Sequence, residues 1–325
     1  MTSWIACRLH LPLEDQCSTA GPIGARVQKT SVSTDWSPKA EEVKLTATDR
    51  AFSPVETGTV ETAPWGSFRT NAVQSALIGL ARRSFLQRGT FRHWTTNLVT
   101  ALGSPLDIEW RGCRYRIEGK NNLIEYGMLL RRDYNGAEID FLLGALEPGG
   151  VALDIGSNIG LYSLPMARAV GPDGRVVAID ANPAMAERLK FNAAASGLAN
   201  VHMVNCAVGG GEGMVDLRIR KDDVAIVHVE ESDTGTIPMR TLASILRELG
   251  VSRVDALKID IEGHEDAALV PFLDEAEDDA LRPDRISIEH PRSGDDYSGC
   301  AAAFERHGYV RVGQTRSNSL YRRSG

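Results

Sequence analysis

The sequence has few cysteines and none that are closely paired. Five cysteines are scattered over 325 residues, and no C-x-x-C pair occurs among them. Disulfide frameworks and cysteine zinc sites both need spaced sets of cysteines, so this distribution argues against either. The fold must instead rely on a hydrophobic core, for which 42% hydrophobic residues are an ordinary supply.

The sequence also lacks an excess of basic residues and any long apolar run. The formal net charge is −7, which suits a phosphate backbone poorly and leads us to expect no nucleic-acid partner. No apolar run approaches the ~18 residues that span a bilayer. The N-terminus has no basic-then-apolar signal pattern. We therefore expect a cytoplasmic protein without a transmembrane segment, and the sequence indicates no oligomeric state.

The first third of the chain divides into two parts. Residues 1–66 show no sustained apolar period and are expected to form a poorly ordered extension. Residues 71–102 have a helical pattern in which four arginines lie among three aromatic residues: Arg82, Arg83, Arg88, Arg92, Phe85, Phe91 and Trp94. A membrane-surface helix is one interpretation. The commoner one, which we favour, is a solvated amphipathic helix docked on the main domain.

The next segment alternates like a hairpin over 106–119, with Arg111-Gly112 at its turn, and a helix is predicted over 134–146. Residues 67–150 thus form a predicted helical and hairpin region that caps the substrate site. Aromatic residues that could stack on an acceptor, though more often core or rim residues, are Trp110, Tyr115, Tyr126, Tyr134 and Tyr297.

Beyond residue 150, short β-branched runs alternate with helical patterns. Strands are predicted at 151–156, 175–180, 201–207, 256–263 and 285–290, and helices near 160–170, 183–196, 241–250, 264–276 and 297–307. This alternation predicts an α/β fold with a doubly wound, mostly parallel Rossmann-like sheet, forming one domain over 151–325. The runs 309–314 and 318–323 predict an antiparallel edge. An inserted hairpin is expected at 214–220 and 225–230, with "GGGEG" (209–213) as a hairpin turn.

The first of these strands leads into a glycine loop, "VALDIGSNIG" (151–160). Glycines allow a tight turn and the close approach of a ligand to the backbone. The loop departs from the dinucleotide pattern G-x-G-x-x-G, since Asn158 replaces one glycine and Asp154 precedes the first. A tight turn without a ligand is the alternative interpretation.

A second acidic residue supports the interpretation that the glycine loop binds a ligand. Asp180 ends the next strand, in "RVVAIDANP", where a carboxylate can accept hydrogen bonds from ribose hydroxyls. Alone, it could equally be a helix N-cap. The loop and this acid, in the correct order, point together to an adenosine-containing ligand.

At this point the chain resembles the FkbM family of S-adenosylmethionine-dependent methyltransferases. The resemblance rests on "VALDIGSNIG", "VVAIDANP", "TLASILRELG" and "DALKIDIEGHE", and it extends from about Gly112 to Tyr321. It implies a class I methyltransferase fold, S-adenosylmethionine as cofactor, and O-methylation of a small acceptor such as a sugar, glycolipid or other natural product.

The resemblance also implies a cofactor-binding set. Asp154, Gly156, Ser157, Asn158 and Gly160 would line the methionine part, with Asp260 nearby. Asp180 and its neighbour Ala181 would serve the ribose. The family more often has Glu at the position of Asp180, so the reach of the shorter side chain is an open question. Residues near the adenine would be Asn205, Cys206 and Ala207.

The segment "KIDIEGHE" (258–265) places carboxylates where a central strand leaves the core. Strand alternation would project Lys258, Asp260 and Glu262 to one side, which is costly unless they face a polar crevice. We therefore interpret this segment as the floor of an active site. The candidates for the base that accepts the hydroxyl proton are left open: His264, Glu262, Asp260 and His290.

Two further alternatives concern cofactors. Asp260, Glu262, Glu289 and His290 have the chemistry of a Mg²⁺ or Mn²⁺ site. The resemblance calls for no metal, so we expect none. A nicotinamide-dependent oxidoreductase on a Rossmann sheet is disfavoured by the missing G-x-G-x-x-G pattern. A scaffold that binds the cofactor without catalysis is disfavoured by the intact acids.

Overall fold

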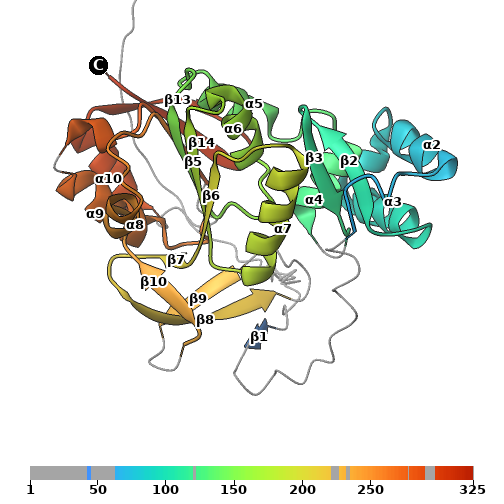
Figure 1. Cartoon of the computed structure of the whole chain (residues 1–325), viewed down its shortest axis with the longest axis horizontal. Helices are drawn as coiled ribbons and strands as arrows, with labels where there is room; N and C mark the ends of the chain where they lie inside the picture. The colour runs from blue at the N-terminus through green and yellow to red at the C-terminus, as the bar shows by residue number, and fades with distance from the viewer. Residues whose placement is uncertain are drawn as a thin grey trace, which may run out of the picture. The chain divides into compact units, whose positions relative to one another are not determined.

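A computed structural model of the chain describes residues 42–44, 63–119, 122–220, 227–231, 235–276, 278–289 and 297–324 (Figure 1). All of them belong to one compact unit, residues 40–325. Among the helices within these ranges, none is long and apolar enough to cross a membrane.

The central element is a seven-stranded sheet in the order β13-β14-β12-β11-β4-β5-β6. Its strands are β4 (Val151–Ile155), β5 (Arg175–Asp180), β6 (Val201–Asn205), β11 (Ala256–Ile259), β12 (Arg285–Glu289), β13 (Tyr309–Gln314) and β14 (Asn318–Arg323). The first five are mutually parallel. β14 pairs antiparallel with β12 and with β13. The predicted parallel sheet with an antiparallel C-terminal edge is confirmed.

Helices cover both faces of this sheet. One face packs against α8 (Leu242–Glu248), α9 (Glu265–Glu275) and α10 (Ser298–Arg306). The other packs against α5 (Gly136–Leu143), α6 (Ser163–Val170) and α7 (Pro183–Ala195). Strand residues alternate between these two cores, as Ala152 and Leu153 show. The arrangement is the doubly wound one, with its switch point between β4 and β11.

A second, smaller sheet is formed by the chain between β6 and α8, together with one short N-terminal strand. Its strands are β1 (Glu42–Lys44), β7 (Ala207–Val208), β8 (Gly213–Arg220), β9 (Val227–Glu231) and β10 (Ile237–Arg240). The predicted hairpin is confirmed, since β8 and β9 pair antiparallel. The prediction that "GGGEG" closes a hairpin was wrong, because β10 lies between β7 and β8. That pairing is long-range and leaves no local sequence signal.

The helical region before residue 150 is more divided than predicted. The single pattern over 71–102 becomes α2 (Ala72–Ala81), the 3₁₀ turn η2 (Phe85–Gln87) and α3 (Gly89–Ala101). Ser84 caps the 3₁₀ turn, and Gly89, the first residue of α3, has a φ of 53°, which separates α3 from that turn. The helix predicted at 134–146 is α5. Sequence reasoning missed α4 (Leu123–Leu130), which is buried nearly all round and so lacks amphipathic periodicity.

The hairpin β2 (Leu106–Trp110) and β3 (Cys113–Ile117) joins this region to the sheet domain. Arg111 and Gly112 both have positive φ, as the predicted two-residue turn requires. Asp107 and Arg116 form a buried ion pair at 2.8 Å, and the same aspartate accepts the N–H groups of Gly66 and Phe68. Residues 63–68 are thereby fixed on the hairpin. The rest of the expected N-terminal extension, apart from β1, lies outside the described residues.

Candidate functional site

Parallel strand tips converge on one pocket at the switch point. This pocket has a volume of about 280 Å³ and is lined by the glycine loop after β4, the tip of β5, and residues after β11. Its charged lining residues are Asp180, Lys258, Asp260, Glu262 and Glu289. Because four acidic side chains and one basic side chain line the pocket, the lining favours a positively charged ligand.

The glycine loop has its conformation for steric reasons. Gly156 has a φ of 78°, and a Cβ there would lie 1.9 Å from the carbonyl oxygen of Asp260. This glycine therefore lets the tips of β4 and β11 approach each other. Gly160 has a φ of 94°, and its Cβ would meet Leu164 Cδ1 at 2.3 Å. Gly156 lines the pocket, whereas Gly160 faces the core and is needed for helix packing.

Asp180 anchors this loop. Its Oδ2 accepts the N–H of Asn158 at 2.7 Å, and its Oδ1 accepts the N–H of Asn182 at 2.8 Å. Burial raises the pKa of Asp180 to about 6, although both backbone hydrogen bonds oppose the shift. The helix cap is Asn182 and not Asp180, because the Asn182 side chain accepts the N–H of Ala184. Asp180 lines the pocket together with Ala181 and Ser157.

Asn158 joins the loop to α4. Its backbone has a φ of 48°, which is a tolerated conformation for asparagine. Its Oδ1 accepts hydrogen bonds from the N–H of Ile159 and from the amide of Asn122, the buried N-cap of α4. The same helix contributes Leu123 and Ile124 to the pocket wall.

Asp154 lies fully buried behind the loop. Its Oδ2 accepts a short hydrogen bond from the Ser163 hydroxyl at the start of α6, while its Oδ1 has no hydrogen-bond partner among the described residues. Burial raises the pKa of Asp154 to about 6, against the hydrogen bond from Ser163 and the charge of Lys258. Asp154 is not among the residues that line the pocket.

The predicted adenine residues occupy the tip of β6 and the start of β7. The Asn205 amide donates to the carbonyl of Asp180 at 2.8 Å, which ties the tips of β5 and β6 together. Cys206 and Ala207 are buried in apolar clusters. Burial raises the pKa of the Cys206 thiol to about 12, so this thiol is inert at neutral pH. None of the three lines the pocket.

Lys258 is the charged residue within β11. Its ammonium is buried and donates to the carbonyl of Ile259 at 3.0 Å and to Asn318 Oδ1 at 2.9 Å. It also donates to Asp260 Oδ2 at 3.3 Å. A buried ammonium with three acceptors is a fixed positive charge, and it fixes the Asp260 carboxylate beside it.

The strand ends earlier than predicted, at Ile259 rather than 263. Glu265 explains the turn that follows, since its two carboxylate oxygens accept the N–H groups of Ile261 and Gly263 at 2.9 Å each. Glu262 lies in this turn with a φ of 54°, a strained conformation for a non-glycine residue. The turn directs Glu262 into the pocket, whereas Glu265 serves the backbone.

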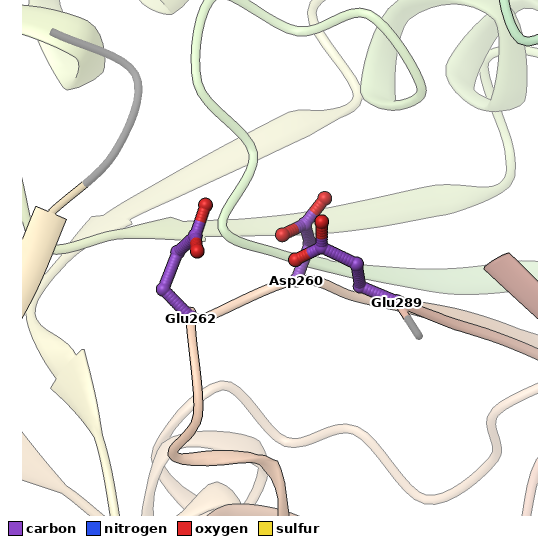
Figure 2. Close-up of side chains that lie close together, drawn as sticks. All are labelled: Asp260, Glu262 and Glu289. Carbon is purple, nitrogen blue, oxygen red and sulfur yellow. The ribbon is translucent and has the colours of Figure 1, made fainter. Parts of the chain in front are cut away.

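Three carboxyl groups meet at the pocket floor (Figure 2). Asp260, Glu262 and Glu289 each offer an oxygen, and these oxygens lie within 4.8 Å of one another. Burial and the charges of Asp260 and Glu262 raise the pKa of Glu289 to about 9, so Glu289 is protonated at neutral pH. One proton in the cluster relieves the repulsion between like charges.

Two histidines were predicted as candidate bases. His264 is the N-cap residue of α9, where its side chain makes no capping hydrogen bond, and it does not line the pocket. His290 lies outside the described residues. Three members of the hypothetical metal set, Asp260, Glu262 and Glu289, are brought together, and their oxygens are chemically suited to a hard divalent cation.

Sequence reasoning missed several pocket residues. Asn135, Tyr162 and Asn318 come from α5's N-terminus, the loop before α6 and the start of β14, and they carry no local motif. Of the aromatic residues considered, Tyr134 lines the pocket. Trp110, Tyr115 and Tyr126 are buried, and Tyr297 packs against the core on the opposite sheet face.

Comparison with known proteins places this geometry in context. Residues 154–311 match a family described as "Methyltransferase FkbM domain". Short segments resemble two curated proteins: an arsenite methyltransferase of Halobacterium salinarum, 39% identical over 57 residues, and a 23S rRNA (uracil(1939)-C(5))-methyltransferase of Acinetobacter baylyi, 43% identical over 56 residues. These segments cover 18% and 17% of this chain, and only 15% and 12% of the relatives.

Among solved structures, the O-methyltransferase TomG of Streptomyces achromogenes is 18% identical and has a TM-score of 0.37. The match covers 59% of this chain and 81% of that one. A SAM-dependent methyltransferase of Agrobacterium tumefaciens is 14% identical, with a TM-score of 0.40, and the match covers 67% and 69% of the two chains.

Proposed function

Because residues 154–311 form a methyltransferase domain of the FkbM family, whose cofactor is S-adenosylmethionine, we propose that this protein methylates a hydroxyl group of a sugar, glycolipid or other natural-product acceptor. The observation that carries the proposal is the carboxyl cluster beside the glycine loop. A hydroxyl acceptor must lose its proton during methyl transfer, and a positioned carboxylate can take it.

The pocket suits this cofactor. S-Adenosylmethionine, when bound, supplies an electrophilic methyl group on a positively charged sulfur. Asp180 would hold the ribose, because each of its oxygens keeps a lone pair beyond the backbone hydrogen bond it accepts. The ionised carboxylates in the lining, Asp180, Asp260 and Glu262, favour a cation and would repel a pyrophosphate, which argues against a nicotinamide cofactor.

The three clustered carboxyl groups take different roles in this proposal. Asp260 is fixed by the ammonium of Lys258. Glu289 carries a proton at neutral pH, so it donates a hydrogen bond rather than accepting the acceptor's proton. Glu262 is then the member of the cluster that serves as general base. His264 takes no part in this scheme, since it does not line the pocket.

The rest of the lining supports a small polar acceptor. Tyr134 and Tyr162 offer aromatic faces, and Asn135 and Asn318 offer amides that can hydrogen-bond hydroxyls. The acidic lining is unsuited to nucleic acid. Cytoplasmic action is supported by Cys113, Cys206 and Cys300, which are buried and unpaired.

The proposal is tested by supplying methyl-labelled S-adenosylmethionine with a panel of sugars, glycolipids and phenols, and by locating the label in the product by mass spectrometry. We expect a methyl ether. Glu262→Gln should keep the affinity for S-adenosylhomocysteine within about twofold and lower turnover by ~10²-fold or more. The exposed Glu305→Gln is the control.

Three results would contradict the proposal. Methylation of nitrogen or carbon would overturn the assignment of the acceptor. Full turnover by Glu262→Gln would overturn the assignment of the base. Cofactor binding without transfer to any acceptor would favour a non-catalytic scaffold.

A further inference from the structure

The exposed apolar side chains of this protein gather on one region. Nine large apolar side chains are exposed among the described residues, and six of them lie within or beside α2, η2 and α3. These six are Val73, Leu80, Phe85, Phe91, Trp94 and Leu102. Scattered exposed apolar residues are normal, but a concentration of this kind marks an interaction surface.

The aromatic members of this group are contiguous. The rings of Phe85 and Phe91 meet edge to face, with centroids 5.0 Å apart. Trp94 follows Phe91 by three residues on α3, so both lie on the same helix face. The three side chains are 62%, 51% and 61% exposed, respectively. We call Phe85, Phe91 and Trp94 the aromatic patch.

The charged side chains in the segment that carries the aromatic patch are of one sign. Residues 62–106 contain five arginines and no aspartate or glutamate, in a chain whose net charge is −7. Arg83 and Arg88 are exposed and have no ion-pair partner among the described residues. The Nε of Arg92 is buried without a hydrogen-bond partner there. Uncompensated arginines beside exposed aromatic rings fit a surface that is both anionic and apolar.

We propose that the aromatic patch and its arginines dock this protein on an anionic lipid surface. Tryptophan and phenylalanine insert at the boundary between headgroups and acyl chains, while arginines pair with lipid phosphates. A lipid surface offers this combination over a wide area, whereas a protein partner would need acidic and apolar groups placed to match.

The docking surface is coupled to the pocket through α4. This helix packs against both α2 and α3, and Arg82 on α2's C-terminus donates to the carbonyl of Leu129 at 3.0 Å. At its other end, Leu123 and Ile124 line the pocket. Figure 1 shows α2 and α3 beside the hairpin, away from α9 and α10. When the aromatic patch lies on a membrane, α9 and α10 would therefore remain in water.

Vesicle flotation of the full-length protein tests the proposal. Neutral phosphatidylcholine vesicles are compared with vesicles that also contain phosphatidylglycerol, at low and at high salt. We expect binding only to the anionic vesicles, weakened by salt. The variant Phe91→Ala with Trp94→Ala should lower the partition coefficient by about tenfold or more. The matched control is Val310→Ala with Val312→Ala, whose side chains on β13 are 48% and 47% exposed.

Charge is tested in the same way. Arg83→Glu with Arg88→Glu should lower binding to anionic vesicles by roughly tenfold or more and should reduce its salt dependence. Arg311→Glu with Arg322→Glu, two exposed arginines on the C-terminal edge, should leave it unchanged. Affinity for S-adenosylhomocysteine confirms that each variant is folded, because none of these residues lines the pocket.

Several outcomes would overturn the proposal. Failure of the wild-type protein to bind anionic vesicles better than neutral ones would do so. Equal binding by the patch variants and their controls would do so as well. If sedimentation velocity shows a dimer that Phe91→Ala with Trp94→Ala dissociates, while vesicle binding is unaffected, the patch is an interface with a second copy.

Discussion

At the scale of single residues, similar carboxylates have different tasks. Glu262 and Glu265 are three residues apart, yet one is held in a left-handed turn at the pocket and the other caps the backbone of that same turn. Asp154 lies within β4 and Asp180 is the last residue of β5, but only Asp180 lines the pocket. Burial and hydrogen-bond partners separate these roles, because residue type alone does not.

Asp180 gives the sharpest test of the cofactor site. Asp180→Ala should weaken S-adenosylhomocysteine binding by ~100-fold or more, since it removes charge-assisted hydrogen bonds and frees the N–H of Asn158. Isothermal titration measures the loss. Asp180→Glu should retain most of the affinity, and the exposed Asp173→Ala should retain all of it. Unchanged binding by Asp180→Ala would remove this residue from the site.

Glu289 predicts a pH dependence of stability. Its pKa is raised to about 9 from a usual value of 4.5, so the folded state holds a proton that the unfolded state releases between those values. This contribution to stability is complete below pH 4.5 and is lost as the pH rises toward 9. Glu289→Gln, which mimics the protonated form, should therefore be more stable than wild type at pH 9 and equal to it near pH 4.5.

Thermal unfolding across this pH range measures the difference. Because Glu289 is partly exposed, we expect a gain of about 1 kcal/mol at pH 9, or roughly 2–4 °C in Tm. The exposed Glu147→Gln should show no such trend. A Tm difference for Glu289→Gln that is the same at every pH would contradict the shared-proton account.

At the scale of elements, the site depends on how closely strand tips approach. Gly156 allows the end of β4 to pass the carbonyl of Asp260 after β11, and the register Asp154–Lys258–Ser287 places three polar residues in a row across β4, β11 and β12. The glycine loop thus shapes the pocket mainly by letting the ends of β4 and β11 pack closely together. Gly160 packs in the core and does not line the pocket.

A glycine pair separates packing from backbone conformation. Gly156 and Gly149 have φ values of 78° and 82°, so an added Cβ strains both by about 1 kcal/mol. Only at Gly156 would the Cβ also collide with backbone, whereas nothing lies within 4 Å at Gly149. Gly156→Ala should therefore lose ~2 kcal/mol more stability than Gly149→Ala, and cofactor affinity with it. Equal losses in thermal unfolding would argue against the close approach.

At the scale of the whole molecule, a buried ion pair holds α4 on the central sheet's helices. Glu125 on α4 pairs with Arg188 on α7, and the other oxygen of Glu125 accepts the N–H groups of Glu118 and Gly119. The amide of Asn122, at the N-cap of α4, donates to Asn158 Oδ1 in the glycine loop and strengthens the same junction. The pocket wall from α4 is therefore positioned by these long-range contacts.

Breaking this buried ion pair should lower the free energy of unfolding far more than breaking an ion pair on the surface. Arg188→Met leaves Glu125 buried without its cation and should lower the free energy of unfolding by ~3–5 kcal/mol. Lys190→Met, on the same helix, breaks an exposed pair with Glu187 and should cost at most ~1 kcal/mol. Chemical denaturation measures both. The double variant Glu125→Gln with Arg188→Met should recover part of the loss, and a small effect of Arg188→Met alone would contradict this role.

The sequence by itself determined the features that depend on near neighbours along the chain. Alternating β and α patterns, the loop at 156–160 and the turn Arg111-Gly112 follow from local sterics and periodicity, so the parallel sheet and its glycine loop could be predicted. Tertiary structure alone decided which distant groups meet. Glu289 joins Asp260 and Glu262 only through strand order and register, and His264, at the N-cap of α9, does not line the pocket. Likewise, the division of 71–102 into separate helices is what leaves Phe85, Phe91 and Trp94 exposed. Contacts across a fold depend on the entropy and geometry of closing long loops, and no local pattern in the sequence encodes them.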